Sequence, residues 1–330
     1  MNIVYLSEQN LIGKVSPDAI SFRSDYAWMK MLDAFHLPYS KAMPSPENEY
    51  YSVIDSADLI LFVPSKLTPD VMILVDQIHK TGKKVCLVQE GPKTYWQNWP
   101  MKHQLLFISL LKKSSIVFCH NENDKKYFEN LTNSPVHTLK TVMDVLYWKE
   151  HRVCPREKNE SVFLGGNMVE WYGGSHSYIV GSHSKIERIG IPTMGRTQPD
   201  EKEILPWFDK RVEYFEYMSW QDFMMTLKDF KYAVHLMPIS AAGSFSLNCG
   251  ALGIPCIGNK DNDTQRLIFP DLSISADDLK SANELMNKLM TDQDFYDMVV
   301  AKALQNVKDF DIGQNKESYE KLLSGVIDGL

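Results

Sequence analysis

The sequence lacks the features that place a protein in a membrane or in an oxidising compartment. No apolar run approaches the roughly 18 residues that a membrane span needs, and the first residues, Met1 to Leu6, are typical of a strand and not of a signal peptide. The five cysteines include no Cys-x-x-Cys pair, and several lie in apolar runs. We therefore expect a cytoplasmic protein with reduced, buried thiols, no disulfide, no zinc site and no membrane partner.

The chain also lacks an excess of basic residues. Its formal net charge of −7 excludes a general electrostatic attraction to nucleic acid. An enzyme that modifies a single base, however, needs only a local basic patch. The lysines of the first half that are candidates for such a patch are Lys93, Lys102, Lys112, Lys113, Lys125 and Lys126. Solvated surface helices explain the same lysines equally well, so the pattern leaves both interpretations open.

Low-complexity segments and short repeats are missing too, and the composition is that of a folded globular protein. Hydrophobic residues make up 44% of the chain and charged residues 23%. The length of 330 residues favours two domains of about 150 residues each. A polar linker, His151 to Glu160, predicts an N-terminal domain over residues 1–150 and a C-terminal domain over residues 151–330, whose last helix is a candidate for return to the first domain.

Apolar strands alternate with segments of helical periodicity along both halves. In the first half the expected strands are Ile3–Leu6, Leu59–Val63, Val85–Gln89 and Ile116–Cys119. The expected helices there are Asp25–Phe35, Asp70–Thr81, Lys102–Leu111 and Asn123–Leu131. In the second half the expected strands are Val162–Leu164, Arg211–Phe215, Tyr232–Met237, Pro255–Ile257 and Leu272–Ile274, followed by a helical tail. This alternation predicts an α/β fold of two Rossmann-like, doubly wound domains that face a cleft.

The most informative segment runs from Ser240 to Gly258 and has the pattern of a strand–turn–helix unit. Gly243 and Ser244 stand at the start of a helix that we expect to end near Leu252, before Gly253. A helix N-terminus beside a glycine is suited to cradle a diphosphate, because its amides are unpaired and nothing blocks the approach of an anion. We expect Gly243→Val to abolish that binding while leaving the fold largely intact. Packing alone is the competing explanation of the small residues.

The same segment resembles the GT-B glycosyltransferases of the retaining, Glu-x7-Glu type. Its glycine turn and the Gly-x-Pro sequence at residues 253–255 match that family, but Ser240 and Asn248 stand where the family has its paired glutamates. Asparagine can still hydrogen-bond a ribose hydroxyl, without charge. Together with residues 264–266 and 269–273, the segment looks like a divergent branch found in tailed-phage genomes, which would place the protein in the host cytoplasm.

The resemblance implies a nucleotide-sugar donor, UDP-linked by expectation, as co-substrate with no other cofactor. The departing diphosphate requires preorganised amides and a cation. We predict that the donor contacts around the glycine turn come from Gly243, Ser244, Phe245, Ser246 and Asn248. We predict Arg196 as the cation, with Arg266 and Lys185 as alternatives, because an arginine fork suits phosphate oxygens.

The nucleoside is expected to lie where strands of the second half end. Gly166 and Asn167 follow the first of these strands, and Tyr217 and Met218 follow another, so their backbone groups are candidates to read the base. Trp220 lies nearby, but its spacing from Phe223 and Leu227 is also that of an ordinary core residue.

The reacting centre and the acceptor are assigned to the first half. Glu90 directly follows a buried strand and precedes a cluster of aromatic residues between Tyr95 and Trp99, which is the composition of a sugar or base pocket. His120 follows the next strand and is a secondary catalytic candidate. An ordinary loop with aromatics wrapped around the domain edge is the competing interpretation.

No metal is expected. The Asp-x-Asp sequence at residues 261–263 follows the Gly-x-Pro strand and is typical of a polar turn. His176 and His183 are spaced to share a helix face, but no carboxylate or cysteine joins them at ligand spacing.

These features favour a glycosyltransferase that moves a sugar to an acceptor hydroxyl with retention, with a hydroxymethylated pyrimidine in phage DNA as the first candidate acceptor. A transferase for a polysaccharide or a small molecule is the alternative. Loss of both family glutamates keeps open a protein that binds a nucleotide sugar without catalysis. The sequence does not indicate an oligomeric state.

Overall fold

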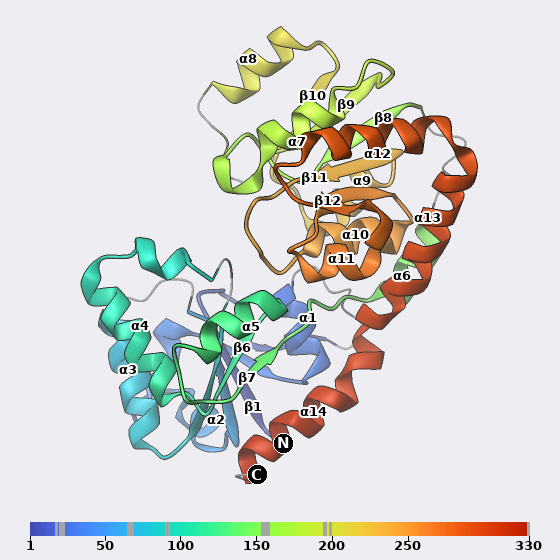
Figure 1. The fold of residues 1–330 in the computed structure, drawn as a ribbon. Helices are drawn as coiled ribbons and strands as arrows, with labels where there is room; N and C mark the ends of the chain where they lie inside the picture. Colours follow the sequence, from blue (N-terminus) through green and yellow to red (C-terminus); the bar gives the residue numbers. More distant parts are fainter. Residues whose placement is uncertain are drawn as a thin grey trace. The chain divides into compact units, whose positions relative to one another are not determined.

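The computed structural model describes residues 1–16, 19, 24–64, 69–89, 91, 93–152, 159–193, 197 and 200–328. Two compact units make up the chain: Met1–Val142 with Ile312–Leu330, and Met143–Asp311. Each has its own β-sheet with helices on both faces (Figure 1). Both units are of the predicted parallel α/β type.

The first unit is built on a seven-stranded sheet in the order β2-β3-β1-β4-β5-β6-β7. Its strands are β1 (Ile3–Ser7), β2 (Gly13–Lys14), β3 (Phe35–Pro38), β4 (Leu59–Phe62), β5 (Lys84–Val88), β6 (Ile116–Cys119) and β7 (Val136–Thr138). Only β2 pairs antiparallel with its neighbour, and the other pairs are parallel. Continuous apolar strands such as β1 and β4 are buried on both faces, as a parallel sheet requires.

Alternate residues of these strands enter two different cores. Ile3 and Tyr5 face α1 (Ser24–Met31) and α14 (Ile312–Asp328), whereas Val4 and Leu6 belong to the core on the other face. The helices that contribute to that second core, or lie beside it, are α2 (Tyr51–Asp55), α3 (Pro69–Lys80), α4 (Met101–Lys113) and α5 (Glu122–Glu129).

The last helix of the chain, α14, is part of the first unit. It contacts α1, and the Tyr319 hydroxyl donates to the Thr138 carbonyl (3.1 Å) and accepts from the Lys140 amide (2.8 Å). Lys84 Nζ donates to the Val326 carbonyl at 2.6 Å. The first unit is therefore closed by residues from both ends of the chain.

The second unit has a six-stranded sheet in the order β10-β9-β8-β11-β12-β13, in which every pair is parallel. Its strands are β8 (Ser161–Leu164), β9 (Arg188–Pro192), β10 (Val212–Phe215), β11 (Tyr232–His235), β12 (Cys256–Asn259) and β13 (Ser273–Ile274). The chain builds outward from β8 on one side and then returns to add β11 on the other. The order of the strands reverses between β8 and β11, which makes a topological switch point.

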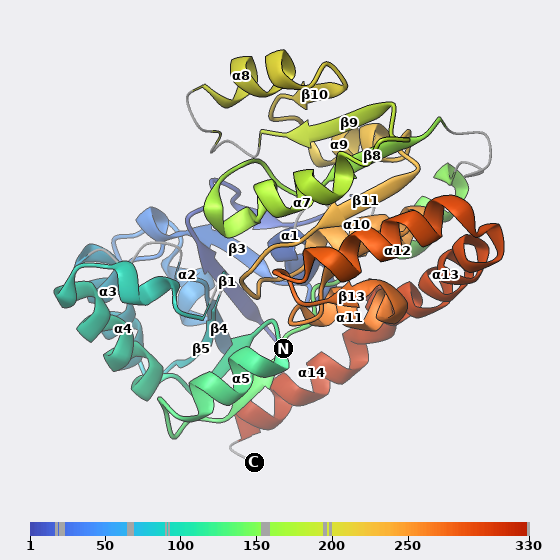
Figure 2. The same cartoon turned by 45° about the horizontal axis from the view of Figure 1, so that its top comes forward.

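Helices cover both faces of this second sheet. They are α6 (Val145–Trp148), α7 (Gly174–Gly181), α8 (Glu201–Phe208), α9 (Trp220–Leu227), α10 (Ser244–Leu252), α11 (Asp263–Ile268), α12 (Leu279–Thr291) and α13 (Gln293–Asn306). The α7 and α12 helices lie side by side on one face, and α9 and α10 lie on the other (Figure 2). Phe163 of β8 contacts Phe223 of α9 and Phe245 of α10, whereas its neighbour Leu164 lies against α7.

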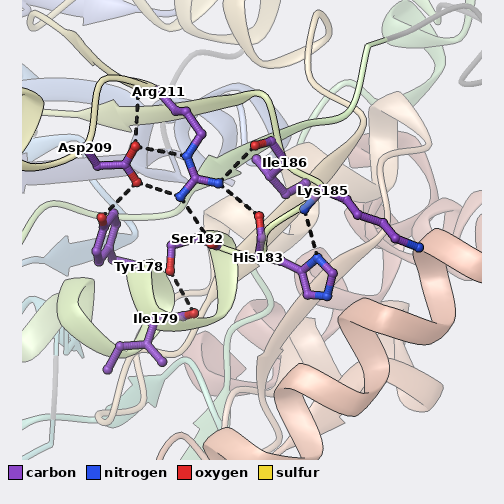
Figure 3. Close-up of polar contacts among 8 residues, drawn as sticks. All are labelled: Tyr178, Ile179, Ser182, His183, Lys185, Ile186, Asp209 and Arg211. Carbon is purple, nitrogen blue, oxygen red and sulfur yellow. Dashed lines mark hydrogen bonds and ion pairs between the residues drawn. The ribbon is translucent and has the colours of Figure 1, made fainter.

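A partly buried arginine fixes the amino end of the second sheet (Figure 3). The Arg211 guanidinium donates to the carbonyls of Ser182 (3.2 Å), His183 (3.0 Å) and Ile186 (3.0 Å) and to the Asp209 carboxylate (2.7 Å). These carbonyls lie in the turn between α7 and β9. One guanidinium thus replaces the water that would otherwise solvate this turn.

Several boundaries differ from the sequence prediction for physical reasons. The first unit ends at Val142, not at residue 150, because Val145 and Trp148 are buried in the core of the second unit. β9 was missed because it contains Gly190 and Pro192, and glycine and proline in a sequence usually indicate a loop and not a strand. A Cβ at Gly190 would lie 2.6 Å from Phe230 Cζ, so the core demands glycine within this strand.

Three further differences concern short elements. Phe35 was predicted to end a helix but begins β3, since the chain turns at Asp33 with a φ of 50°. The three-residue β7 and the two-residue β2 were also missed. Among the described residues, no helix is both long and apolar enough to cross a membrane.

Candidate functional site

The candidate site of the second unit lies at the carboxyl edge of its sheet, where β8 and β11 end side by side. Parallel strands end at the same edge, so residues 165–167 after β8 and residues 236–238 after β11 are neighbours. Ligands of doubly wound sheets bind at this edge, at the switch point.

Two glycines let the segments at this edge approach one another. A Cβ at Gly165 would lie 2.3 Å from His235 Cγ, and a Cβ at Gly166 would lie 2.6 Å from Tyr172 Cβ. Asn167, which follows them, is fully buried. Its side chain donates to the Thr193 carbonyl at 2.7 Å and accepts from the Val169 amide at 3.2 Å. Asn167 therefore ties the ends of β8 and β9 together, and a contact with a nucleoside stays a prediction.

Helix α10 begins at the same edge behind a glycine whose replacement would strain the backbone and displace neighbouring side chains. Gly243 has a φ of 71°, and a Cβ there would lie 1.6 Å from Thr264 Oγ1 and 2.3 Å from Asn262 Oδ1. No side chain of the described residues caps this helix. The first backbone amides of a helix have no partner within it, so the first turn of α10 presents free N–H groups to an anion.

The side chains of Phe245 and Ser246 in this first turn pack against, or form hydrogen bonds with, other residues of the protein. Phe245 is buried against Phe163 and His235, with ring centroids 6.3 and 5.2 Å away. Ser246 donates its hydroxyl to Gln265 Oε1 at 2.7 Å. Asn248 is 6% exposed, and Ser244 is the exposed residue of this first turn. If these predicted residues bind a diphosphate, they do so mainly through their backbone.

His235, at the end of β11, was not predicted from the sequence and is a further buried polar side chain of this region. It is 9% exposed, and among the described residues its Nε2 has no hydrogen-bond partner. Burial lowers the pKa of the imidazole to about 4, so His235 is neutral at physiological pH. The available signal was a single polar residue within the apolar run from Tyr232 to Met237.

The predicted base-reading residues follow the edge strand β10. Tyr217 is 79% exposed, and Met218 is half-buried and accepts a weak hydrogen bond from Thr226. β10 is two strands away from β8, which corresponds to about 10 Å, a span suited to a nucleoside attached to a diphosphate at the switch point. Trp220 packs edge-on against Trp148 at 5.3 Å, as a core residue does.

The predicted cations differ in position. Arg196 lies outside the described residues. Lys185 lies before β9, at the amino end of the sheet and therefore opposite to the first turn of α10, and its side chain points away from the Arg211 cluster (Figure 3). Arg266 lies in α11, which follows β12 at the carboxyl edge, and it pairs with Asp263 at 2.9 Å. Of the two alternatives, only Arg266 is at the correct edge.

In the first unit, the candidate residues follow the adjacent strands β5 and β6. Glu90 lies outside the described residues. His120 is 5% exposed and stacks on Trp28 with ring centroids 4.8 Å apart. Its Nδ1 donates to the Leu139 carbonyl at 3.1 Å, which leaves Nε2 as a buried acceptor without a partner among the described residues. Burial lowers the pKa of His120 to about 4 and keeps it neutral.

The aromatic cluster after β5 belongs mostly to the core. Trp96 is buried against Phe107 of α4 at 5.4 Å, and Trp99 meets the same ring edge-on at 5.7 Å. Tyr95 is 41% exposed. The packing of Trp96 and Trp99 agrees with the competing interpretation, in which the aromatic residues wrap around the domain edge. Tyr95 remains accessible to a ligand.

The residues considered for a metal have protein partners. Asn262 accepts from Thr264 at 2.7 Å, and His176 donates to the Ala276 carbonyl at 3.0 Å. His183 lies beyond the end of α7 and does not share a helix with His176. No group of three potential metal-ligating side chains occurs among the described residues.

Comparison with known proteins shows a likeness of structure without a likeness of sequence. No family model matches the chain, and no curated protein matches its sequence at a significant level. HepE from Anabaena, solved in complex with UDP-glucose, superposes with a TM-score of 0.70 at 11% identity, over 98% of this chain and 100% of that one.

Two further structures are similar over nearly their whole length. Sucrose-phosphate synthase from Thermosynechococcus elongatus gives a TM-score of 0.71 at 10% identity, with 100% of both chains covered. An alpha-glucosyltransferase in complex with UDP and a 13-mer DNA containing an HMU base gives 0.65 at 11% identity, with 98% of both chains covered. The chain therefore has the GT-B fold that these glycosyltransferases share.

Proposed function

We propose that the protein is a glycosyltransferase that uses a UDP-linked sugar. The observation that carries this proposal is the first turn of α10, an uncapped helix start behind Gly243 at the switch point of a parallel sheet. Such a turn binds phosphate through its backbone amides. The similar HepE structure holds UDP-glucose, which supports a nucleotide-sugar donor for this chain.

In this proposal the second unit binds the donor and the first unit binds the acceptor. The amides of α10 stabilise the charge that develops on the diphosphate as the bond to the sugar breaks, and Arg196 adds a cation. The acceptor hydroxyl forms the new bond to the same sugar carbon, and its proton passes to an oxygen of the departing diphosphate. We propose retention on this basis, since the route needs neither of the two glutamates in whose places Ser240 and Asn248 stand.

A hydroxymethylated pyrimidine in DNA is the acceptor that we propose first. Support comes from the similar alpha-glucosyltransferase, whose structure contains DNA with an HMU base, and from the lysines of the first unit. Lys102, in the first turn of α4, is exposed on the side of the helix that follows β5, whereas Lys112 and Lys113 lie in its last turn, before the amino end of β6, and do not add to this support. A carbohydrate acceptor is the second candidate, since the HepE structure has also been solved with UDP and glucose.

The test supplies UDP-glucose or a UDP-pentose with hydroxymethylated DNA, with unmodified DNA and with a set of simple sugars. We expect a product on modified DNA only, with a yield that falls as salt rises, because contacts to phosphates release counterions. Transfer to sugars alone would replace the DNA acceptor with a carbohydrate. Donor binding without any transfer would instead favour the non-catalytic protein.

A further inference from the structure

Helix α8 of the second unit presents an apolar face to solvent. Ile204, Trp207 and Phe208 are 56%, 74% and 72% exposed. Their spacing of three and four residues places them on one face of the helix. A helix on the surface of a folded domain normally turns such a face to the core, so the pattern of α8 is the reverse of the usual one.

The opposite side of α8 is fixed to the second unit. Leu205 packs against the core, and the buried carboxylate of Glu201 accepts from the Met168 amide and from the Tyr214 hydroxyl, both at 2.9 Å. The helix lies beside β10, which is the edge strand of the second sheet (Figure 2). The apolar face therefore cannot turn into the core without breaking these bonds.

The size of this apolar face is that of the centre of a protein interface. The side chains of tryptophan and phenylalanine each have roughly 150–250 Å² of surface, so Trp207 and Phe208 at their observed exposure leave on the order of 200–350 Å² uncovered. Ile204 adds to this area. Monomeric proteins rarely expose a larger contiguous apolar patch. A stable interface buries about 800 Å² on each partner, with an apolar centre and a polar rim, and the face of α8 supplies such a centre.

The charges around this face favour a second copy of the chain as the partner. Asp200 precedes the first turn of α8, Lys210 follows the last turn, and both are exposed. A two-fold axis through the middle of the helix, at Leu205, pairs two copies antiparallel, so that Asp200 of each copy faces Lys210 of the other. A membrane surface or a nucleic acid would instead favour an excess of basic residues, whereas Lys202 and Glu203 beside the face have opposite charges.

We propose that the outer face of α8 is the contact of a symmetric homodimer, with Trp207 and Phe208 of both copies at its centre. This inference does not depend on the proposed function, because it involves neither the donor nor the acceptor.

Analytical ultracentrifugation over a range of protein concentrations measures the dissociation constant of the dimer. W207S removes the largest side chain of the face from both copies, and we expect the dissociation constant to rise roughly 100-fold or more, as the loss of a central aromatic residue does. L105S is the matched control, because Leu105 is 61% exposed on α4 of the first unit. It should keep the dissociation constant of the wild type.

Reversal of charge tests the antiparallel arrangement. D200K and K210E each place like charges opposite one another at both ends of the contact, and either should weaken the dimer about tenfold. The double variant D200K/K210E restores opposite charges and should recover most of the affinity. These substitutions at exposed positions keep the test decisive if W207S loses its cooperative thermal unfolding.

Three results would overturn the proposal. The first is a wild type that stays monomeric at every concentration, and the second is a dimer that persists unchanged in folded W207S or, if W207S does not fold, in both charge variants. The third is flotation of the monomeric wild type, but not of W207S, with phosphatidylcholine vesicles, which would assign the face to lipid. A double variant as weak as the single ones would exclude the antiparallel pairing of α8.

Discussion

Replacing Gly243 with alanine is the perturbation whose size the structure predicts best. Gly243 and Gly253 flank the same helix with nearly equal φ angles, 71° and 73°. Alanine in this left-handed conformation costs roughly 1–2 kcal/mol at either position. The two sites differ in space: a Cβ at Gly253 would meet nothing closer than 3.4 Å, whereas a Cβ at Gly243 would lie 1.6 Å from Thr264 Oγ1.

The difference between the two variants is therefore the measured quantity. G243A must displace Thr264 and break its 2.7 Å hydrogen bond to Asn262, which adds about 1–2 kcal/mol to the conformational strain. We expect a loss of about 1–2 kcal/mol in the free energy of unfolding for G253A, and of roughly 2–4 kcal/mol for G243A, by urea denaturation. The sequence-based prediction that Gly243→Val spares the fold was wrong, because the side chain would enter occupied space.

Binding provides the second half of this test. G253A lies at the far end of α10 and should keep the wild-type affinity for UDP, whereas G243A should lose it because the first turn is displaced. Equal stability of the two variants would refute the packing argument. Wild-type UDP affinity in G243A would refute the assignment of the first turn as the diphosphate site.

Other predictions concern the reacting centre, the cation and the response to acid. Glu90→Gln should lower kcat with little change in donor affinity, and normal turnover would make Glu90 a structural loop residue. Arg196→Ala should weaken UDP binding far more than uridine binding, and equal losses would place Arg196 outside the diphosphate site. The hydrogen bond from Arg211 lowers the pKa of Asp209 to about 2 in the folded protein, below its value near 4 in the unfolded chain. The ionised Asp209 therefore stabilises the fold above pH 4, and this stabilisation is lost as the pH falls towards 2. The free energy of unfolding of D209N should not show this loss. Because burial lowers the pKa of His120 to about 4, the unfolded state binds more protons between roughly pH 6.5 and 4, and H120F should lose less stability than the wild type over that interval.

The architecture could be predicted well from the sequence, because a parallel α/β fold requires apolar strands and glycines at helix ends, and both are easily recognised in a sequence. Apolar runs such as Ile116–Cys119 are buried on both faces of a parallel sheet and are hard to mistake. Glycines at positions 243 and 253 bracket a helix that the structure places at Ser244–Leu252. The prediction of short strands failed where the strand contains a glycine or proline, because these residues usually indicate a loop. At Gly190, within β9, it is tertiary packing that requires the glycine.

The candidate site could be predicted only in part. Periodicity identified which loops end at the carboxyl edge, but it could not show that Phe245 and Ser246 turn into the core while their amides remain available. Nor could periodicity show that His235, a polar residue within an apolar strand, is buried with an Nε2 that has no partner among the described residues.

A crystal structure of the protein with UDP tests the central claim most directly. The account predicts a diphosphate within hydrogen-bond distance of the backbone amides of Ser244 and Phe245, with the nucleoside extending towards the end of β10. UDP bound at another place, or a crystal soaked in saturating UDP that shows none at the first turn of α10, would contradict it.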